Sequence, residues 1–327
     1  MTVYLDAMGG DNAPEEIIKG AVLAVNELNT NITLIGKEDI IKNCFASLAL
    51  SDKNISIINA EQTIEMCEEP VKAVRSKKDS SMVIGASLLK EDKNSVFISA
   101  GSTGALLAAA LLYTGRIKGV QRPALCTMMP SQNPCLFLDN GANADCKSEY
   151  LVQFAKMGTI YMQSVMAVKN PSVGLLNIGT EKLKGNAFAK EAHELLSKEE
   201  SINFAGNIEP KDLIEGKCDV VVADGFTGNL VLKSIEATLS YMLTMVKGVM
   251  KDGFKNSIAG ALLKKDLKEK LKTMDPSSYG GAPFLGINGG VFKTHGNSNA
   301  NAVKNAVRLA LSFQKENVLS KMTKVLW

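Results

Sequence analysis

The chain has 327 residues, of which 46% are hydrophobic and 22% charged, as expected of a globular protein with a sizeable core. Its net charge of +3 and aromatic content of 6% argue against a nucleic-acid-binding protein, which needs a basic field and stacking surfaces. Six cysteines without a CxxC pair and only two histidines favour reduced thiols in a cytoplasmic protein, and we expect no metal site.

The first predicted elements are a strand with its turn over residues 3–10 and a helix that follows. Residues 1–16 lack the basic start and apolar core of an export signal, which favours a cytoplasmic location. Asp11 or Asn12 is the expected N-cap of the helix, because either side chain can accept hydrogen bonds from unpaired backbone N–H groups.

Short β-rich runs continue to alternate with helical stretches along the chain, without a repeat or a linker. This alternation predicts a mostly parallel sheet covered by helices on both faces. The further expected strands lie within residues 31–36, 54–60, 95–101, 135–143, 172–181, 202–208, 218–229 and 282–296.

Residues 99–119 combine a glycine- and hydroxyl-rich opening with an apolar run. The run, Ala105–Tyr113, is less than half of the ~20 residues that cross a membrane, so we expect a buried helix. The opening places backbone N–H groups and two hydroxyls at the helix N-terminus, which suits a phosphate, although a simple Ser102 cap is the alternative. It consists of Gly101, Ser102, Thr103 and Gly104.

Six predicted strands end in a glycine-rich polar turn. In open α/β sheets ligands bind beyond the carboxyl ends of the strands, so we expect these turns to line one cleft. Neither G-x-G-x-x-G nor a Walker A sequence occurs, and no nucleotide cofactor is expected. The turns are Asp6–Gly10, Ser99–Gly104, Asp139–Asn143, Asn177–Gly179, Asp224–Asn229 and His295–Asn297.

A set of motifs in this order resembles the acyl-acyl-carrier-protein:phosphate acyltransferase family of bacterial phospholipid synthesis. They run from residue 3 to about 310, which is essentially the whole chain. They are LDAMGGD, SAGSTGA, LDNGAN, LLNIGTEKLKGN, FAGNIEP, DVVVADGFTGN, YGGAPFLGINGG and KTHGNSN.

The resemblance implies a single domain over 1–327 with a three-layer α/β/α fold, similar to isocitrate and isopropylmalate dehydrogenases. It also implies a homodimer that acts at the membrane surface without spanning it and without a cofactor. In that family a fatty acyl group passes from acyl carrier protein to inorganic phosphate. A downstream membrane glycerol-3-phosphate acyltransferase then uses the acyl phosphate.

For this chemistry we expect Lys182 and Lys184 to bind phosphate and to stabilise the negative charge that develops on the carbonyl oxygen. His295 is the expected acid or hydrogen-bond donor to the leaving thiol, and Asn229 and Asn143 are expected donors. The aspartates of the turns are expected to orient these donors. The remaining expected substrate contacts are Asp6, Asp139, Asn140, Asn177, Gly179, Asp224, Gly225 and Asn297.

Other mechanisms and functions stay open at this point. Cys146, expected in the first turn of a helix where a thiolate is favoured, allows a covalent acyl-cysteine route. A short-chain phosphate acetyl- or butyryltransferase that uses coenzyme A is the main alternative enzyme. A dehydrogenase of the related fold and a non-catalytic membrane scaffold for lipid enzymes are the others.

A basic amphipathic segment occupies the third quarter of the chain. Residues 230–271 have a helical pattern, with interruptions expected near Gly248, Gly253 and Gly260, and we expect a helical protrusion at about 230–275. Residues 247–272 contain eight lysines but only three acidic residues. Such a segment suits an anionic membrane surface, whereas acidic acyl carrier protein and a dimer helix pair are alternative partners. The expected membrane contacts are Phe254, Ile258, Leu262 and Leu263.

Overall fold

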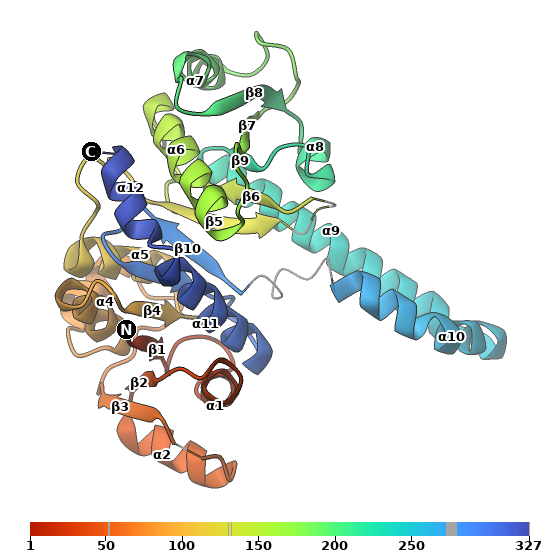
Figure 1. Ribbon diagram of the computed structural model, residues 1–327. Coiled ribbons are helices and arrows are strands. Elements are labelled where there is room, and N and C mark those ends of the chain that lie inside the picture. The colour runs from red at the N-terminus through yellow and green to blue at the C-terminus, as the bar shows by residue number, and fades with distance from the viewer. Residues whose placement is uncertain (52, 130, 132, 273–279, 327) are drawn as a thin grey trace.

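The computed structural model describes residues 1–51, 53–129, 131, 133–272 and 280–326. Within them, eleven strands form one sheet in the order β3-β2-β1-β4-β11-β10-β5-β6-β9-β7-β8, with helices on both faces (Figure 1). The strands are β1 (Val3–Asp6), β2 (Ile32–Gly36), β3 (Ile55–Asn59), β4 (Val96–Ser99), β5 (Ala124–Met129), β6 (Cys135–Leu138), β7 (Ser172–Leu176), β8 (Asn203–Ile208), β9 (Val220–Val222), β10 (Ala282–Leu285) and β11 (Gly290–Lys293).

The helices form the two outer layers of the predicted three-layer α/β/α architecture. One face is covered by α1, α2, α6, α7, α11 and α12, and the other by α3 to α5 together with α8 and α9. The helices are α1 (Glu15–Leu28), α2 (Glu38–Ser47), α3 (Pro70–Ser76), α4 (Ser81–Glu91), α5 (Thr103–Ala109), the π-helix η1 (Ala110–Thr114), α6 (Ser148–Val165), α7 (Ala187–Lys198), α8 (Pro210–Glu215), α9 (Gly225–Lys251), α10 (Gly253–Lys272), α11 (Ala300–Lys315) and α12 (Val318–Leu326).

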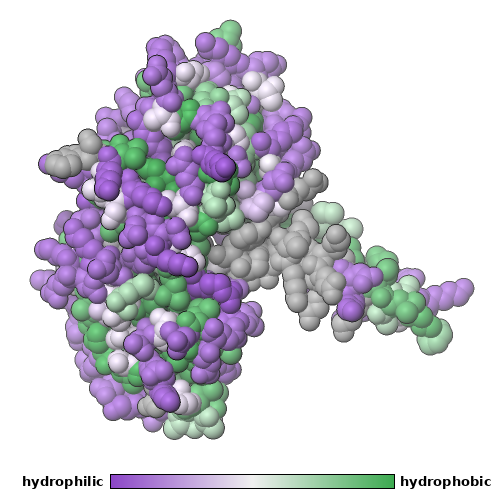
Figure 2. Space-filling view, viewed as in Figure 1, coloured by the Kyte–Doolittle hydropathy of each residue, from purple (hydrophilic) through white to green (hydrophobic). Residues whose placement is uncertain are grey.

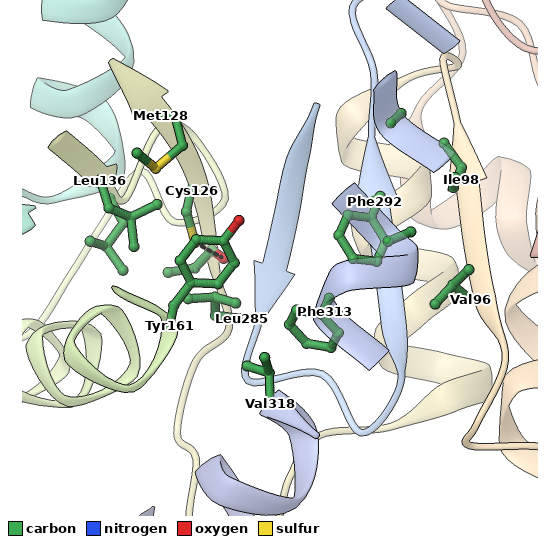
Figure 3. Close-up of a cluster of buried hydrophobic side chains, with 14 of the residues drawn as sticks. Val96, Ile98, Cys126, Met128, Leu136, Tyr161, Leu285, Phe292, Phe313 and Val318 are labelled. Atoms are coloured by element: carbon green, nitrogen blue, oxygen red, sulfur yellow. Dashed lines mark hydrogen bonds between the residues drawn. The ribbon is translucent and has the colours of Figure 1, made fainter. Parts of the chain in front are cut away.

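The inner strands are largely apolar because successive side chains enter opposite cores. In β6, Leu136 joins the core under α6 and α11, whereas Phe137 joins the core under α8 and α9. Figure 3 shows the first core, in which strands from both halves of the sheet meet. The rings of Phe292 and Phe313 stack edge to face there, with their centroids 5.4 Å apart.

The direction of the strands reverses in the middle of the sheet. β3, β2, β1, β4 and β11 are parallel to one another, and so are β6, β9, β7 and β8. Between these two blocks, β11–β10, β10–β5 and β5–β6 are all antiparallel pairs. The two parallel blocks therefore run in opposite directions, and their carboxyl ends lie at opposite edges.

The sequence analysis did not foresee this reversal. It missed β5, whose sequence ALCTMM has neither polar alternation nor many β-branched residues. It also treated 282–296 as one strand, whereas β10 and β11 form an antiparallel pair on either side of a turn that contains Gly286 at φ +94°. The single-domain organisation stays a prediction.

The start of α1 also differs from expectation. The helix begins at Glu15 after the N-cap Pro14, without a side-chain cap, so neither Asp11 nor Asn12 caps it. Asn12 instead donates hydrogen bonds to the carbonyl oxygens of Asn297 (3.1 Å) and Ser298 (3.4 Å). The Asn12 side chain thus links the loop after β1 to the loop after β11. Because its amide is used in these two hydrogen bonds, it does not cap α1.

The predicted helical protrusion is present: α9 and α10 form a hairpin that projects from the body (Figure 1). The interruption expected near Gly253 is present, since α10 begins at this residue, at φ +79°. Gly248 and Gly260 lie inside the helices and interrupt neither, so those two expectations were wrong. Gly260 allows a close approach, because a Cβ there would lie 3.0 Å from Met250 Cβ. Residues 273–275 of the expected protrusion lie outside the described residues.

The predicted burial of the apolar run after β4 is confirmed, since most of α5 and part of η1 are inaccessible to solvent. Across the described ranges, none of the helices combines the length and the apolar character needed to cross a membrane.

Candidate functional site

The first group of polar turns lies where β1, β4 and β11 end. Asp6 is buried, and its Oδ2 accepts a hydrogen bond of 2.6 Å from Ser99 Oγ. The loop after β1 needs glycine, because a Cβ on Gly9 would lie 2.5 Å from Asp6 Oδ2 and 2.8 Å from the nitrogen of Gly101. Burial raises the pKa of Asp6 despite the hydrogen bonds from Ser81 and Ser99.

The turn after β11 is joined to this group. The carbonyl of Gly296 accepts a hydrogen bond of 2.7 Å from the Asp11 N–H. Within the turn, His295 and Asn297 are exposed, and Asn297 N–H donates to His295 Nδ1 at 3.5 Å. The structure therefore brings together the turns that follow β1, β4 and β11.

A buried lysine in the same place was missed by the sequence analysis. Lys293 is 9% exposed, and its Nζ donates to the carbonyl of Ala100 at 3.1 Å and to that of Thr294. Burial lowers the pKa of Lys293 to about 8, although Asp6 and Asp11 oppose the shift. A lysine that closes the apolar strand GVFK is the sequence signal that could have identified it.

The opening of α5 shows the Ser102 cap that the sequence left open as an alternative, and its contact with phosphate stays a prediction. Ser102 is the N-cap of α5, since its Oγ accepts from the Ala105 N–H at 3.5 Å. Gly104 is exposed beside α3, where its Cβ would lie 2.8 Å from Pro70 Cγ. The cap alternative is thus observed, and the turn also presents backbone at the surface.

The second group of turns is organised by Asp139, after β6. This carboxylate is fully buried and accepts four hydrogen bonds: from Leu125 N–H (3.0 Å), Ala142 N–H (3.1 Å), and the N–H (2.7 Å) and side-chain amide (2.9 Å) of Asn143. Burial raises the pKa of Asp139 to about 6, although these bonds lower it. The amide of Asn143 also donates to the Pro123 carbonyl at 2.7 Å, so both its hydrogens are used.

The N-terminus of α9 packs directly onto this loop. Asp224 caps the helix by accepting from Thr227 N–H at 2.9 Å. A Cβ on Gly225 would lie 2.7 Å from Asp139 Oδ2, and one on Gly228 would overlap the Asp139 carbonyl oxygen. Glycine at both positions therefore permits the contact between the helix and the loop.

Two asparagines flank this contact. Asn140 is buried and its Nδ2 donates to the Phe137 carbonyl at 2.8 Å, whereas its Oδ1 has no hydrogen-bond partner among the described residues. Asn229 is exposed, and its side chain lies beside Gly141, where a Cβ would be 3.3 Å from Asn229 Cγ. Both amides border the start of α9.

The predicted lysines lie on a loop at the same edge, after β7. Asn177 fixes the loop, because its Nδ2 donates to the Lys184 carbonyl at 3.2 Å and its Oδ1 accepts from Ile178 N–H. Lys182 and Lys184 are exposed, and the only ion pair that the described residues give Lys184 is a distant one of 3.9 Å with Glu181. Both lysines thus offer cations on an anchored loop.

The six turns therefore form two groups rather than a single row, because the two strand blocks run in opposite directions. Two observations relate the groups to each other. Ala142 of the second group packs against the apolar cluster that contains Ala105 and Leu106 of α5. Lys233, in the third turn of α9, lies near enough to lower the pKa of Lys293.

The expectation for Cys146 is wrong. It precedes α6 instead of lying in its first turn, because the N-cap is Lys147 and the helix begins at Ser148. Burial raises the pKa of Cys146 to about 11, so it is a thiol at neutral pH. Within the described ranges, no group of three or more His, Cys, Asp or Glu side chains is placed to hold a metal ion.

Comparison with known proteins gives full-length matches. The model of the family described as "Fatty acid synthesis protein" matches residues 1–321. A phosphate acyltransferase from Acetivibrio thermocellus is 47% identical over 324 residues, which cover 98% of this chain and 95% of the relative. A putative phosphate acyltransferase from Clostridium perfringens is 45% identical over 99% of this chain and 96% of its own length.

Solved structures show a similar fold at low identity. A phosphotransacetylase from Streptococcus pyogenes has a TM-score of 0.65 at 16% identity, covering 97% of this chain and 94% of that one. A 4-hydroxythreonine-4-phosphate dehydrogenase from Burkholderia phymatum has a TM-score of 0.50 at 11% identity, covering 98% and 97%. These likenesses concern the fold alone, and they confirm the predicted dehydrogenase-like α/β class.

Proposed function

The chain belongs to the fatty acid synthesis protein family and is a phosphate acyltransferase, and we propose that it transfers a long-chain acyl group from acyl carrier protein to inorganic phosphate. The full-length similarity to phosphate acyltransferases carries this proposal. We also propose that the acyl phosphate product serves a membrane glycerol-3-phosphate acyltransferase in phospholipid synthesis, and that the enzyme acts from the cytoplasm.

In the proposed reaction, a phosphate oxygen attacks the thioester carbonyl carbon, and the carbon–sulfur bond then breaks to release the carrier thiol. Lys182 and Lys184 hold phosphate and stabilise the developing oxyanion. His295 accepts a hydrogen bond at Nδ1 from Asn297 N–H, which assigns its own proton to Nε2. That N–H donates a hydrogen bond to the departing sulfur, and the hydrogen phosphate that attacks supplies the proton of the released thiol.

The structure refines the proposed roles of the polar turns. Asn229 keeps its role as a donor because its amide is exposed, whereas Asn143 becomes a positioning residue because both amide hydrogens are used. Asp6, Asp139 and Asp224 orient neighbouring donors. The other proposed contacts with phosphate or the acyl group are Gly101, Ser102, Thr103, Gly104, Asn140, Asn177, Gly179, Gly225 and Asn297.

The acyl donor is tested with purified protein, palmitoyl-acyl carrier protein and phosphate. We expect phosphate-dependent release of the carrier thiol together with formation of acyl phosphate. Turnover of acetyl-coenzyme A but not of the carrier-bound donor would favour the short-chain transferase, whose fold the Streptococcus pyogenes structure shares. If the protein turns over neither acyl donor, the result would favour the non-catalytic membrane scaffold.

Lys184→Ala tests the phosphate-binding loop. We expect turnover to fall by about a hundredfold, the scale of losing one preorganised charge at a developing oxyanion. The melting temperature should stay the same because the side chain is exposed. Lys190→Ala, an exposed lysine on α7, is the matched control. Unchanged turnover in Lys184→Ala would remove this residue from the site.

We further propose that the tip of the α9–α10 hairpin contacts the membrane peripherally. Phe254 is 82% exposed and Leu262 is 76% exposed, and Ile258 and Leu263 are also exposed. Figure 2 shows this apolar surface at the far end of the hairpin. Exposed lysines lie next to it, among them Lys255, so the tip combines apolar area with positive charge.

A charge insertion at the tip tests this contact. The double variant L262E/L263E should lose binding to vesicles that contain anionic lipid while turnover of the soluble donor persists. N256E/S257E, on exposed polar positions of α10, changes the charge equally without removing apolar area. Binding retained by L262E/L263E, or lost equally in both variants, would contradict an apolar contact.

The proposed homodimer has a candidate surface on α9. Apolar residues recur at helical spacing along one stripe, and all are exposed in the isolated chain. A second copy that covers this stripe would remove it from water. Val249→Asp should lower the mass in sedimentation equilibrium from two chains to one, and an unchanged mass would place the interface elsewhere. The stripe consists of Tyr241, Met242, Met245, Val246 and Val249.

A further inference from the structure

Lys293 occupies an unusual position for a lysine. It is the last residue of β11, in register with Ser99 of β4 on one side and Ala282 of β10 on the other. A strand on each side and loops beyond its end leave the side chain only 9% exposed. Burial of a charge at this depth is unfavourable unless the charge is compensated, so the partners of the ammonium matter.

The partners of the Lys293 ammonium are neutral. Two of its three N–H groups point to the carbonyls of Ala100 and Thr294. Asp6 and Asp11 act on it electrostatically, but neither forms an ion pair with Lys293 in the part of the chain that the structure describes. Asp6 already accepts hydrogen bonds from Ser99 Oγ and the Met8 N–H. No carboxylate of the described residues contacts the ammonium, so its positive charge is not neutralised by an ion pair.

Three loops close around this ammonium with very little space between their backbones. A Cβ on Gly10 would lie 2.8 Å from Ala100 Cβ and 2.9 Å from the Gly296 carbonyl, so the loops after β1, β4 and β11 touch one another. These loops also carry Ser102 and His295, which the proposed reaction uses. A small anion bound at the end of β11 would meet a cation that is held in place by its two carbonyl contacts.

We propose that Lys293 binds the inorganic phosphate substrate, as the buried cation of the site at the ends of β1, β4 and β11. This inference rests on the proposed phosphate acyltransfer and assigns a fixed, buried charge to the first group of turns, whereas the exposed Lys182 and Lys184 belong to the second. A phosphate oxygen takes the third N–H of the ammonium and supplies the missing negative charge. Because the Nζ is held by Ala100 and Thr294, binding requires little reordering of the side chain.

Lys293→Met tests the proposal because it removes the charge and keeps the length and apolar character of the stem. We expect the KM for phosphate to rise about ten- to hundredfold, the scale of one charged hydrogen bond, while the KM for the acyl donor stays the same. Phosphate should raise the melting temperature of the wild type but not that of the variant. Lys293→Arg, which retains the charge, should recover part of the phosphate affinity.

A measurement on the unaltered protein covers the case in which Lys293→Met does not fold. Cyanate carbamylates neutral amines, and the lowered pKa of Lys293 makes it partly neutral near pH 8. Inorganic phosphate should slow modification of Lys293, read by peptide mass spectrometry, relative to chloride at equal ionic strength. Exposed Lys190 should show no such protection.

The outcomes separate this inference from the proposed function. A folded Lys293→Met variant with an unchanged KM for phosphate, or unprotected carbamylation of Lys293, overturns the inference and leaves the acyltransfer intact. An equal rise of both KM values means that Lys293 only holds the loops, which also overturns it. A wild type without phosphate-dependent thiol release contradicts the proposed function itself.

Discussion

Replacing Asp139 by asparagine should change how the stability of the protein depends on pH. In the wild type, a fully buried carboxylate accepts hydrogen bonds from Leu125, Ala142 and Asn143. The isosteric amide keeps the shape of the side chain but cannot ionise. Its NH₂ group faces two of the donors, so the variant carries an additional penalty that is independent of pH.

The magnitude follows from the two pKa values of the carboxyl group. Burial raises the pKa of Asp139 from 3.8 to about 6, a difference of about two units, or about 3 kcal/mol. Between these pH values the native state binds the proton more tightly than the unfolded state. The contribution of Asp139 to stability is therefore greatest below about pH 4 and is lost as the pH rises to about 6.

Urea denaturation followed by circular dichroism, for both proteins at pH 4 and pH 7, measures this effect. The stability of the wild type minus that of Asp139→Asn should fall by about 2.4 kcal/mol from the lower to the higher pH, because pH 4 is already slightly above the unfolded-state pKa. Taking the difference cancels every other titrating group that the two proteins share. A constant difference, or one that rises with pH, would show that the four hydrogen bonds outweigh burial and that the pKa of Asp139 is not raised.

Two further substitutions have defined outcomes. Gly228→Ala should lower stability by about 3 kcal/mol and reduce turnover, because its Cβ would overlap the Asp139 carbonyl oxygen and push α9 away from the loop. Gly248→Ala, in the same helix but with no atom within 4 Å, should instead add about 0.5–1 kcal/mol, and equal effects in chemical denaturation would contradict the steric argument. Cys146→Ser should retain wild-type release of the carrier thiol, because burial holds the pKa of Cys146 near 11; loss of turnover in a folded variant would restore the covalent route.

Local sequence signals were sufficient for the α/β class and for the positions of most strands. Apolar runs such as VFIS and CLFL are buried on both faces, and each ends in a turn that the sequence marks with glycine or asparagine. The projecting hairpin also follows from its own pattern, because α10 is long and basic and most of its residues from 253 to 263 are exposed. These features depend on short stretches of chain and are therefore visible without the fold.

The features that the sequence did not predict depend on partners far away in the chain. The pairing of β10 with β5 joins Phe284 to Leu125, and no local pattern at either position specifies it. The reversal of strand direction, and with it the separation of the turns into two groups, follows from that pairing. The importance of Lys293 likewise appears only when β4, β10 and β11 enclose it.

The place of β10 and β11 in the sheet has a consequence for biosynthesis. They lie between β4 and β5, so the hydrogen bonding that connects the two strand blocks is completed by residues 282–293, near the end of the chain. A nascent chain that stops before them presents β4 and β5 as unpaired edges, which are templates for aggregation. Residues 282–293 leave the ribosome after the other nine strands, and chaperone protection of the two emerging strand blocks should be needed until then.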